Sequence, residues 1–267
     1  MQDSIETEAT GFDSLYVGQE QSPTIRKIFR ETLGFAELDE AFVPFSFVSL
    51  KDLQNILASL NVSKGELLAD IGCGNGSIGL WLTQSSEARL VGVDVSAAAL
   101  EQARNKAQKL HLAAQTKFQP GSFETTGLAS ESVDAVVSID AIWLASDQQQ
   151  AFKELARILK KGGHLVFTSW EQHIPMSFVK QPIKNYRPLL EQAGFEIVSY
   201  DYPPHFEPLQ LKIYERVRLA QDVLMAEMGA ASQSLIGEAH FVPGLVDGVN
   251  YISPENGPHV LIVAKRV

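Results

Sequence analysis

The chain has 267 residues, and its 22 Lys and Arg against 32 Asp and Glu give a formal net charge of −10. This acidic balance argues against a nucleic-acid partner, because proteins that bind nucleic acids neutralise phosphates with clustered Lys and Arg. Hydrophobic residues make up 45% of the chain, enough for a sizeable core, yet no apolar run approaches the ~18–20 residues that span a membrane.

The first 60 residues are expected to form a helical cap or lid. Residues 1–22 are polar with scattered Phe12, Leu15 and Tyr16, which suggests a flexible or lid-like entry segment. Apolar residues at helical spacing then predict one helix from Pro23 to about residue 34 and another over residues 49–60.

The most informative segment is LLADIGCGNGSIG at residues 67–79. An apolar strand ends at Asp70, glycines follow at 72, 74 and 76, and a helical pattern begins at once, which is the entry unit of a nucleotide-binding α/β fold. A dinucleotide motif, G-x-G-x-x-G, would need glycine at position 77, where this chain has Ser77. The alternative pattern, acid-x-G-x-G-x-G, fits at every place from Asp70 to Gly76.

This segment resembles the first motif of class I S-adenosylmethionine-dependent methyltransferases. The resemblance implies a Rossmann-like, doubly wound α/β sheet of seven strands, mostly parallel with an antiparallel last strand. It also implies that the glycine loop passes the amino-acid end and sulfur of the cofactor, with an acid holding the ammonium group. The cofactor residues implied by the motif are Asp70, Gly72, Gly74, Asn75 and Gly76.

A second acid follows at the spacing expected for a ribose ligand. Residues 90–94 form a short apolar run that ends in Asp94, and an acid there accepts hydrogen bonds from ribose hydroxyls in nucleotide-binding α/β folds. Val95 lies beside it, and Ser96 is the expected N-cap of a helix over 97–110. The competing interpretation of Asp94 is an acid at a helix start.

The adenine contact is expected after a third strand at residues 116–119. In many members of the family an acid that bonds the adenine amino group stands where this chain has Ser122, so the serine is a departure from the pattern. Phe123 could lie against the adenine ring or fill the core. Cys73, the only cysteine, is expected to be there for its size, and no metal motif is visible.

The rest of the core follows in alternation. A fourth strand over 132–139 leads to Asp140, which we expect to face the cofactor because ligands bind beyond the carboxyl ends of parallel strands. A helix over 149–160 is expected to end at Lys161-Gly162-Gly163, before a fifth strand over 164–169. A helix over 183–193, a sixth strand over 195–200 and a last strand over 258–264 complete the pattern.

The predicted organisation has a lid at 1–60, a cofactor-binding core at 61–202, a helical insertion at 203–258 and the last core strand at 259–267. One long helix over 209–228 is expected to dominate the insertion and to cover the acceptor pocket. The polar, acidic N-terminus is unlike a signal or transit peptide, so a cytoplasmic location without a membrane partner is expected.

The resemblance implies transfer of a methyl group from S-adenosyl-L-methionine to a small molecule by in-line displacement, leaving S-adenosyl-L-homocysteine. His173 is the candidate general base and Tyr16 a candidate for orienting the acceptor, with His205 and His240 as alternatives. The segment Ser138-Ile-Asp-Ala-Ile-Trp143 lacks the Asn-Pro-Pro-aromatic run typical of amide and exocyclic-amine methylation. A non-catalytic or repurposed cofactor binder, a protein or RNA methyltransferase and a nicotinamide oxidoreductase remain the alternatives.

Overall fold

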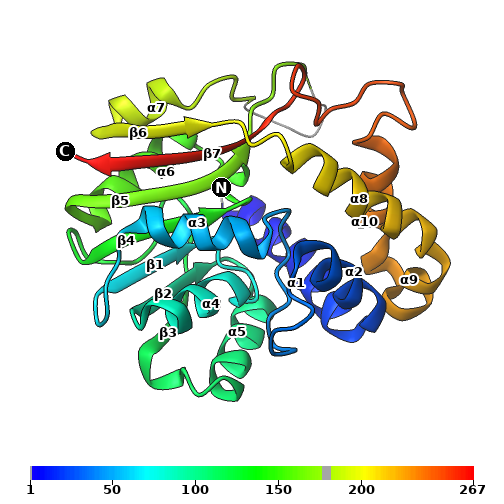
Figure 1. The fold of residues 1–267 in the computed structure, drawn as a ribbon, viewed down its shortest axis with the longest axis horizontal. Helices are drawn as coiled ribbons and strands as arrows, with labels where there is room; N and C mark the ends of the chain where they lie inside the picture. The colour runs from blue at the N-terminus through cyan, green and yellow to red at the C-terminus, as the bar shows by residue number, and fades with distance from the viewer. Residues whose placement is uncertain (1, 176–181) are drawn as a thin grey trace.

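The computed structural model describes residues 2–175 and 182–267 and centres on one sheet of seven strands in the order β3-β2-β1-β4-β5-β7-β6 (Figure 1). The strands β1 to β5 run parallel, whereas β7 pairs antiparallel with both β5 and β6. This confirms the doubly wound sheet with an antiparallel last strand. The strands are β1 (Leu67–Ile71), β2 (Arg89–Asp94), β3 (Thr116–Pro120), β4 (Val133–Ile139), β5 (Leu159–Trp170), β6 (Phe195–Asp201) and β7 (His259–Arg266).

Both faces of the sheet are covered, which explains why its inner strands are mostly apolar. Leu68 packs on the side of α3 (Leu50–Leu60), α4 (Ser77–Ser86) and α5 (Ala97–Lys109). Its neighbour Ala69 points to the other side, where α6 (Gln148–Ile158) and α7 (Arg187–Gln192) pack. The carboxyl ends of β1 and β4 are adjacent, and their connections leave in opposite directions along the sheet, so a ligand crevice is expected there.

The first predicted helices are confirmed, and local signals explain their ends. Ser22 caps α2 (Pro23–Leu33) by accepting a bond from the Ile25 amide, and Gly34 ends it in the left-handed conformation. Ser49 and Asp52 form a capping box at the start of α3.

Residues Gln2–Gln21 form helix α1 rather than a flexible entry segment. The helix contacts α5 and α9, and its Asp13 carboxylate accepts bonds from the Ser96 hydroxyl (2.5 Å) and the Ala98 amide (3.1 Å). These tertiary contacts explain why a segment with a weak apolar pattern is helical, since packing overrides propensity.

The insertion contains three helices, α8 (Phe206–Leu219), α9 (Gln221–Met228) and α10 (Ser232–Phe241), where one long helix over 209–228 was predicted. The break falls at Ala220, whose backbone φ of −100° and ψ of 7° are not helical. Among the described residues, none of the helices combines the length and the apolar character needed to cross a membrane.

The Lys161-Gly162-Gly163 turn also differs from its prediction. Helix α6 ends at Ile158, and the turn lies within the long strand β5. A Cβ on Gly163 would lie 2.6 Å from the carbonyl oxygen of Asp134, so glycine is needed where the two strands approach. The predicted helix over 183–193 is shorter and spans Arg187–Gln192.

Candidate functional site

The glycine loop joins β1 to α4 at the carboxyl edge of the sheet. Gly72, Gly74 and Gly76 have φ values of 74°, 50° and 74°, in the left-handed region that favours glycine. The Gly72 and Cys73 amides bond to the carbonyl of Val93 at 2.8 and 3.1 Å, which ties the loop to the end of β2. The loop then delivers the N-terminus of α4, where amide groups and the helix dipole favour an anionic ligand group.

Asp94, the last residue of β2, lies against the glycine loop. Its Oδ2 accepts a bond from the Gly74 amide at 2.7 Å, and its Oδ1 accepts one from the Ser96 amide at 2.9 Å. Burial raises the pKa of this carboxyl, while the amide bonds oppose the rise. Asp94 therefore lies against the glycine loop, where a ribose could reach its remaining lone pairs.

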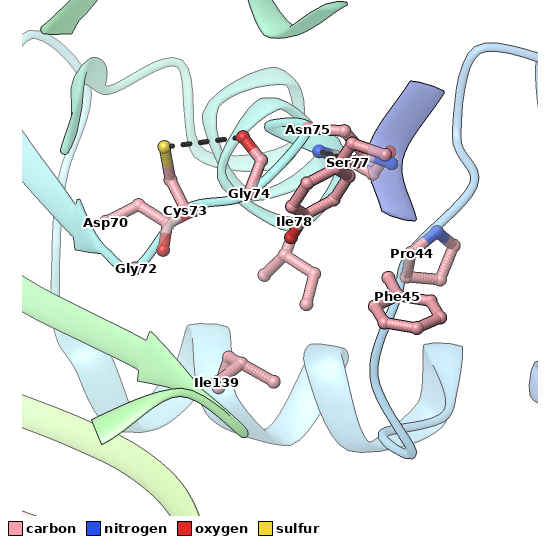
Figure 2. A pocket seen from close by; sticks show the side chains of 11 residues that line it. Pro44, Phe45, Asp70, Gly72, Cys73, Gly74, Asn75, Ser77, Ile78 and Ile139 are labelled. Carbon is pink, nitrogen blue, oxygen red and sulfur yellow. Dashed lines mark hydrogen bonds between the residues drawn. The ribbon is translucent and has the colours of Figure 1, made fainter. Parts of the chain in front are cut away.

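Asp70 is buried at the end of β1 and lines the cavity beside the loop (Figure 2). Its Oδ2 is buried without a hydrogen-bond partner among the described residues and faces Gly79 of α4. Burial, together with the charge of Asp94, raises the pKa of Asp70 to about 7. The Asp70 carboxylate thus borders a small space in which an added positive charge would stabilise its ionised form.

The cavity beside the loop measures only about 30 Å³, room for little more than a water molecule or two. Tyr16 of α1 fills the space next to Gly74: a Cβ built on that glycine would collide with the Tyr16 hydroxyl. Burial and the charges of Asp94, Cys73 and Asp70 raise the pKa of the Tyr16 phenol well above its usual value. The residues that line the cavity are Tyr16, Pro44, Phe45, Asp70, Gly72, Cys73, Gly74, Asn75, Ser77, Ile78 and Ile139 (Figure 2).

Replacing Gly74 with Ala is expected to destabilise the fold by more than the ~1–2 kcal/mol of a left-handed alanine alone, because its Cβ also collides with Tyr16. Gly65→Ala is the matched control, since Gly65 has a φ of 80° and open space around its Cβ position. Urea unfolding of both variants measures the difference. Equal losses would mean that Tyr16 does not press on the loop.

The predicted adenine contacts lie on the far side of the loop. Phe123 packs on Gly72, since a Cβ there would lie 2.9 Å from the Phe123 ring, and 2.7 Å from the Cβ of Ala141. Ser122 closes a tight turn by accepting a bond from the Thr125 amide at 3.2 Å. Ser122, Phe123 and Val95 are all partly exposed and do not line the small cavity.

Asp140 is engaged by the protein itself at the end of β4. Its carboxylate accepts bonds from the Thr168 hydroxyl (2.5 Å) and the Phe47 amide (2.8 Å), and it pairs with Nε2 of His259 at 2.6 Å. These partners hold the pKa of Asp140 below its usual value although burial opposes them. Trp170 stacks on the His259 ring, with centroids 4.5 Å apart. That Asp140 binds the cofactor remains a prediction, since the hydrogen bonds of its carboxylate in this structure are to protein groups.

The predicted base His173 lies after β5, apart from the residues that line the cavity. Its Nε2 is 2.9 Å from Glu171 Oε2, and its Nδ1 is 3.0 Å from the carbonyl of Glu255. Glu171 is buried and also accepts a bond from the Tyr200 hydroxyl. The alternatives are similarly occupied, because His205 pairs with Asp52 at 2.8 Å and His240 lies 3.4 Å from Gln221 Oε1.

Sequence reasoning missed two residues near the site, His259 and Lys106. Lys106 on α5 is buried and donates to the Ser77 hydroxyl, which lines the cavity, at 2.9 Å. The sequence does indicate that Lys106 is buried, because this lysine lies on the apolar face of α5 with Ala99, Ala103 and Ala107. His259 carried no local signal, since its partner Asp140 is 119 residues away.

The residues present fit S-adenosylmethionine. Two strand-tip acids beside the loop match a ligand that carries an ammonium and a sulfonium charge. The glycines at 72, 74 and 76 let a ligand approach the loop backbone closely, and Asp94 lies against this loop.

Comparison with known proteins agrees with this fit. Residues 69–167 match the family model "Methyltransferase domain". Methyltransferase GfsG of Streptomyces halstedii is 25% identical over 72% of this chain and 78% of its own length. Sterol 24-C-methyltransferase of Candida albicans is 29% identical over 42% of this chain, but the match covers only 30% of that enzyme.

Among solved structures, Phosphoethanolamine N-methyltransferase 2 of Haemonchus contortus, crystallised with S-adenosylhomocysteine, superposes with a TM-score of 0.69 at 20% identity. The alignment covers 91% of this chain and 60% of that one, and at 20% identity it shows a shared fold alone. The domain match over residues 69–167, the relatives and the fold agree with the motif and support a class I S-adenosylmethionine-dependent methyltransferase.

Proposed function

We propose that the chain methylates a small-molecule acceptor that binds beneath a roof of helices. The roof consists of α1 and α2 of the N-terminal segment and of the insertion (203–258); α3 packs on the sheet, and the cofactor core is 61–202 with 259–267. Helix α8 is fastened to α2 by Arg216, which bonds to Glu31 at 2.6 Å and Thr32 at 2.8 Å. Helix α9 is fastened to the start of α2 by Glu227, which accepts a bond from the Thr24 hydroxyl at 2.8 Å. Because helices from both the N-terminal segment and the insertion cover the site, a small acceptor fits it better than a nucleic-acid strand or a folded protein does.

The inner wall of the roof is aromatic where it meets the carboxyl ends of β4 and β5. The Phe47 ring lies 5.4 Å from Tyr214 of α8 and 5.9 Å from Trp170, and Trp143 lies 6.0 Å from Trp170. An apolar wall with a few fixed polar groups is the usual composition of a small-molecule site. This aromatic cluster is the single observation that carries the proposal.

Within this site we assign the ribose to Asp94 and the amino-acid end to the loop from Gly72 to Asn75, near Asp70. Val95, Ser122 and Phe123 are the proposed adenine neighbours. The bound cofactor supplies an electrophilic methyl group, and the protein aligns an acceptor lone pair behind it and excludes water. Because the cavity holds only about 30 Å³, Tyr16 and α1 must withdraw from the glycine loop when the cofactor enters.

A general base is needed only if the acceptor is a hydroxyl or a protonated amine. His173 is bound to Glu171 outside the cavity, so it would act only after a rearrangement. Tyr16 is the nearer candidate for orienting an acceptor, since it lines the cavity and His173 does not.

Incubation of the protein with methyl-labelled S-adenosylmethionine tests the proposal. We expect label in a small organic molecule from a metabolite panel, none in added protein or RNA, and loss of labelling in Asp94→Ala. Label in protein or RNA alone would overturn the choice of acceptor. Tight cofactor binding with no transfer to any acceptor would favour the non-catalytic alternative.

A further inference from the structure

Lys106 is a buried cation at the back of the glycine loop. It projects from α5, is 6% exposed, and donates one hydrogen bond, from Nζ to the Ser77 hydroxyl at 2.9 Å. Ser77 is the first residue of α4 and lines the cavity (Figure 2). The Lys106 ammonium group is therefore one hydrogen bond away from the cavity wall.

The charge of Lys106 has no carboxylate partner within 4 Å in the described part of the chain. Glu20 of α1 acts on it only at longer range, while Arg26 of α2 and Lys109 of α5 repel it. Burial, with these repulsions, lowers the pKa of Lys106 to about 7. A buried charge without a counter-ion is costly, so an anion beside Ser77 would be stabilised strongly.

The two sides of the cavity differ in charge. Asp70 makes the strand-tip side of the cavity negative, whereas the Lys106 ammonium group makes the side behind Ser77 positive. S-adenosylmethionine has two cationic groups, the ammonium and the sulfonium, and a single anionic group, its carboxylate. Building on the proposed function, we propose that Lys106, held behind Ser77, binds the carboxylate of the cofactor.

The Ser77 hydroxyl holds the Lys106 ammonium group in place by accepting its hydrogen bond. It donates to the carbonyl of Val43 at 3.0 Å and accepts from the Val43 amide at 3.1 Å, so its place is set by the segment before Pro44. Asn75 reinforces the arrangement by donating to the same carbonyl at 3.1 Å. The remaining N–H groups of Lys106 are free to meet a carboxylate that enters beside Ser77.

The test compares two ligands that share the thioadenosine part. S-adenosylhomocysteine has the amino-acid end, and 5′-methylthioadenosine lacks it. We expect Lys106→Met to weaken binding of S-adenosylhomocysteine by about 10- to 100-fold, the size expected for a charged hydrogen bond, and to leave 5′-methylthioadenosine within about twofold. Lys109→Met, an exposed lysine in the last turn of the same helix, is the matched control and should change neither affinity.

Each outcome separates the two proposals. If both ligands lose affinity equally in Lys106→Met, Lys106 only clamps the loop, and the inference is wrong while the proposed function stands. Unchanged binding of both ligands also overturns the inference. If the wild-type protein binds neither ligand, the proposed cofactor site is wrong, and the inference about Lys106 is wrong with it. Circular dichroism and the unfolding midpoint of Lys106→Met show whether the variant is folded before affinities are compared.

Discussion

Replacing Asp140 with Ala is expected to lower the free energy of unfolding by about 3–5 kcal/mol, the loss typical of breaking a buried charged pair. The reason is that three donors lose their acceptor at once: the Thr168 hydroxyl, the Phe47 amide and Nε2 of His259. His259 is 5% exposed and its Nδ1 already lacks a partner among the described residues, so water cannot easily replace the carboxylate. Urea unfolding at pH 7 measures the change.

Backbone strain at Asp140 can be separated from the lost bonds. Its φ of 55° lies in the left-handed region, which alanine adopts less readily than aspartate or glycine. Asp140→Gly should therefore be more stable than Asp140→Ala by about 1 kcal/mol, while both lose the carboxylate. Asp201→Ala, an exposed carboxylate at the end of β6, is the control and should stay within about 0.5 kcal/mol of wild type. A similarly small loss in Asp140→Ala would mean that the Asp140–His259 pair does not hold this edge of the sheet together.

The same pair predicts how stability depends on pH. The folded state holds the pKa of Asp140 below its ordinary value, so the carboxylate stabilises the fold above that ordinary value and this contribution is lost as pH falls. Between about pH 5 and pH 3 the wild type should lose more stability than Asp140→Asn, because aspartate in the unfolded chain titrates near 3.9. Equal losses of stability in the two proteins would show that another group controls how stability falls at acid pH.

Asp94→Ala is expected to weaken S-adenosylhomocysteine binding by about 10- to 100-fold, or about 1–3 kcal/mol, because the proposed hydrogen bond from the ribose to a buried carboxylate is removed. The Gly74 amide also loses its acceptor, so the loop becomes less well ordered. Asp94→Asn keeps an acceptor for that amide and removes the charge, and it should recover part of the affinity. Glu101→Gln, an exposed acid on the following helix, controls for the change in net charge. Affinity unchanged in Asp94→Ala would leave Asp94 as an acid at a helix start.

The parts of the fold that were predictable are those set by residues close in sequence. The glycines at 72, 74 and 76 require left-handed backbone, and the structure has it at all three. Asp94 follows a short apolar strand and lies against the loop, as its spacing predicts. The sheet order was implied by the family resemblance, since alternating strands and helices alone do not fix it.

What could not be predicted depends on contacts between distant segments. Helix α1 has little apolar periodicity, and its placement depends on α5 and α9, which come later in the chain. The break at Ala220 interrupts an apolar stripe that continues through it in the sequence. Asp140 was predicted to face the cofactor because it ends a strand, but its bond to His259 at the start of β7 emerges only when the sheet is assembled.

A calorimetric titration of the wild-type protein with S-adenosylhomocysteine, and separately with NAD, tests the central assignment most directly. The geometry of the glycine loop and the two strand-tip acids predicts saturable one-site binding of S-adenosylhomocysteine and no binding heat with NAD. Saturable binding of NAD without any response to S-adenosylhomocysteine would contradict it.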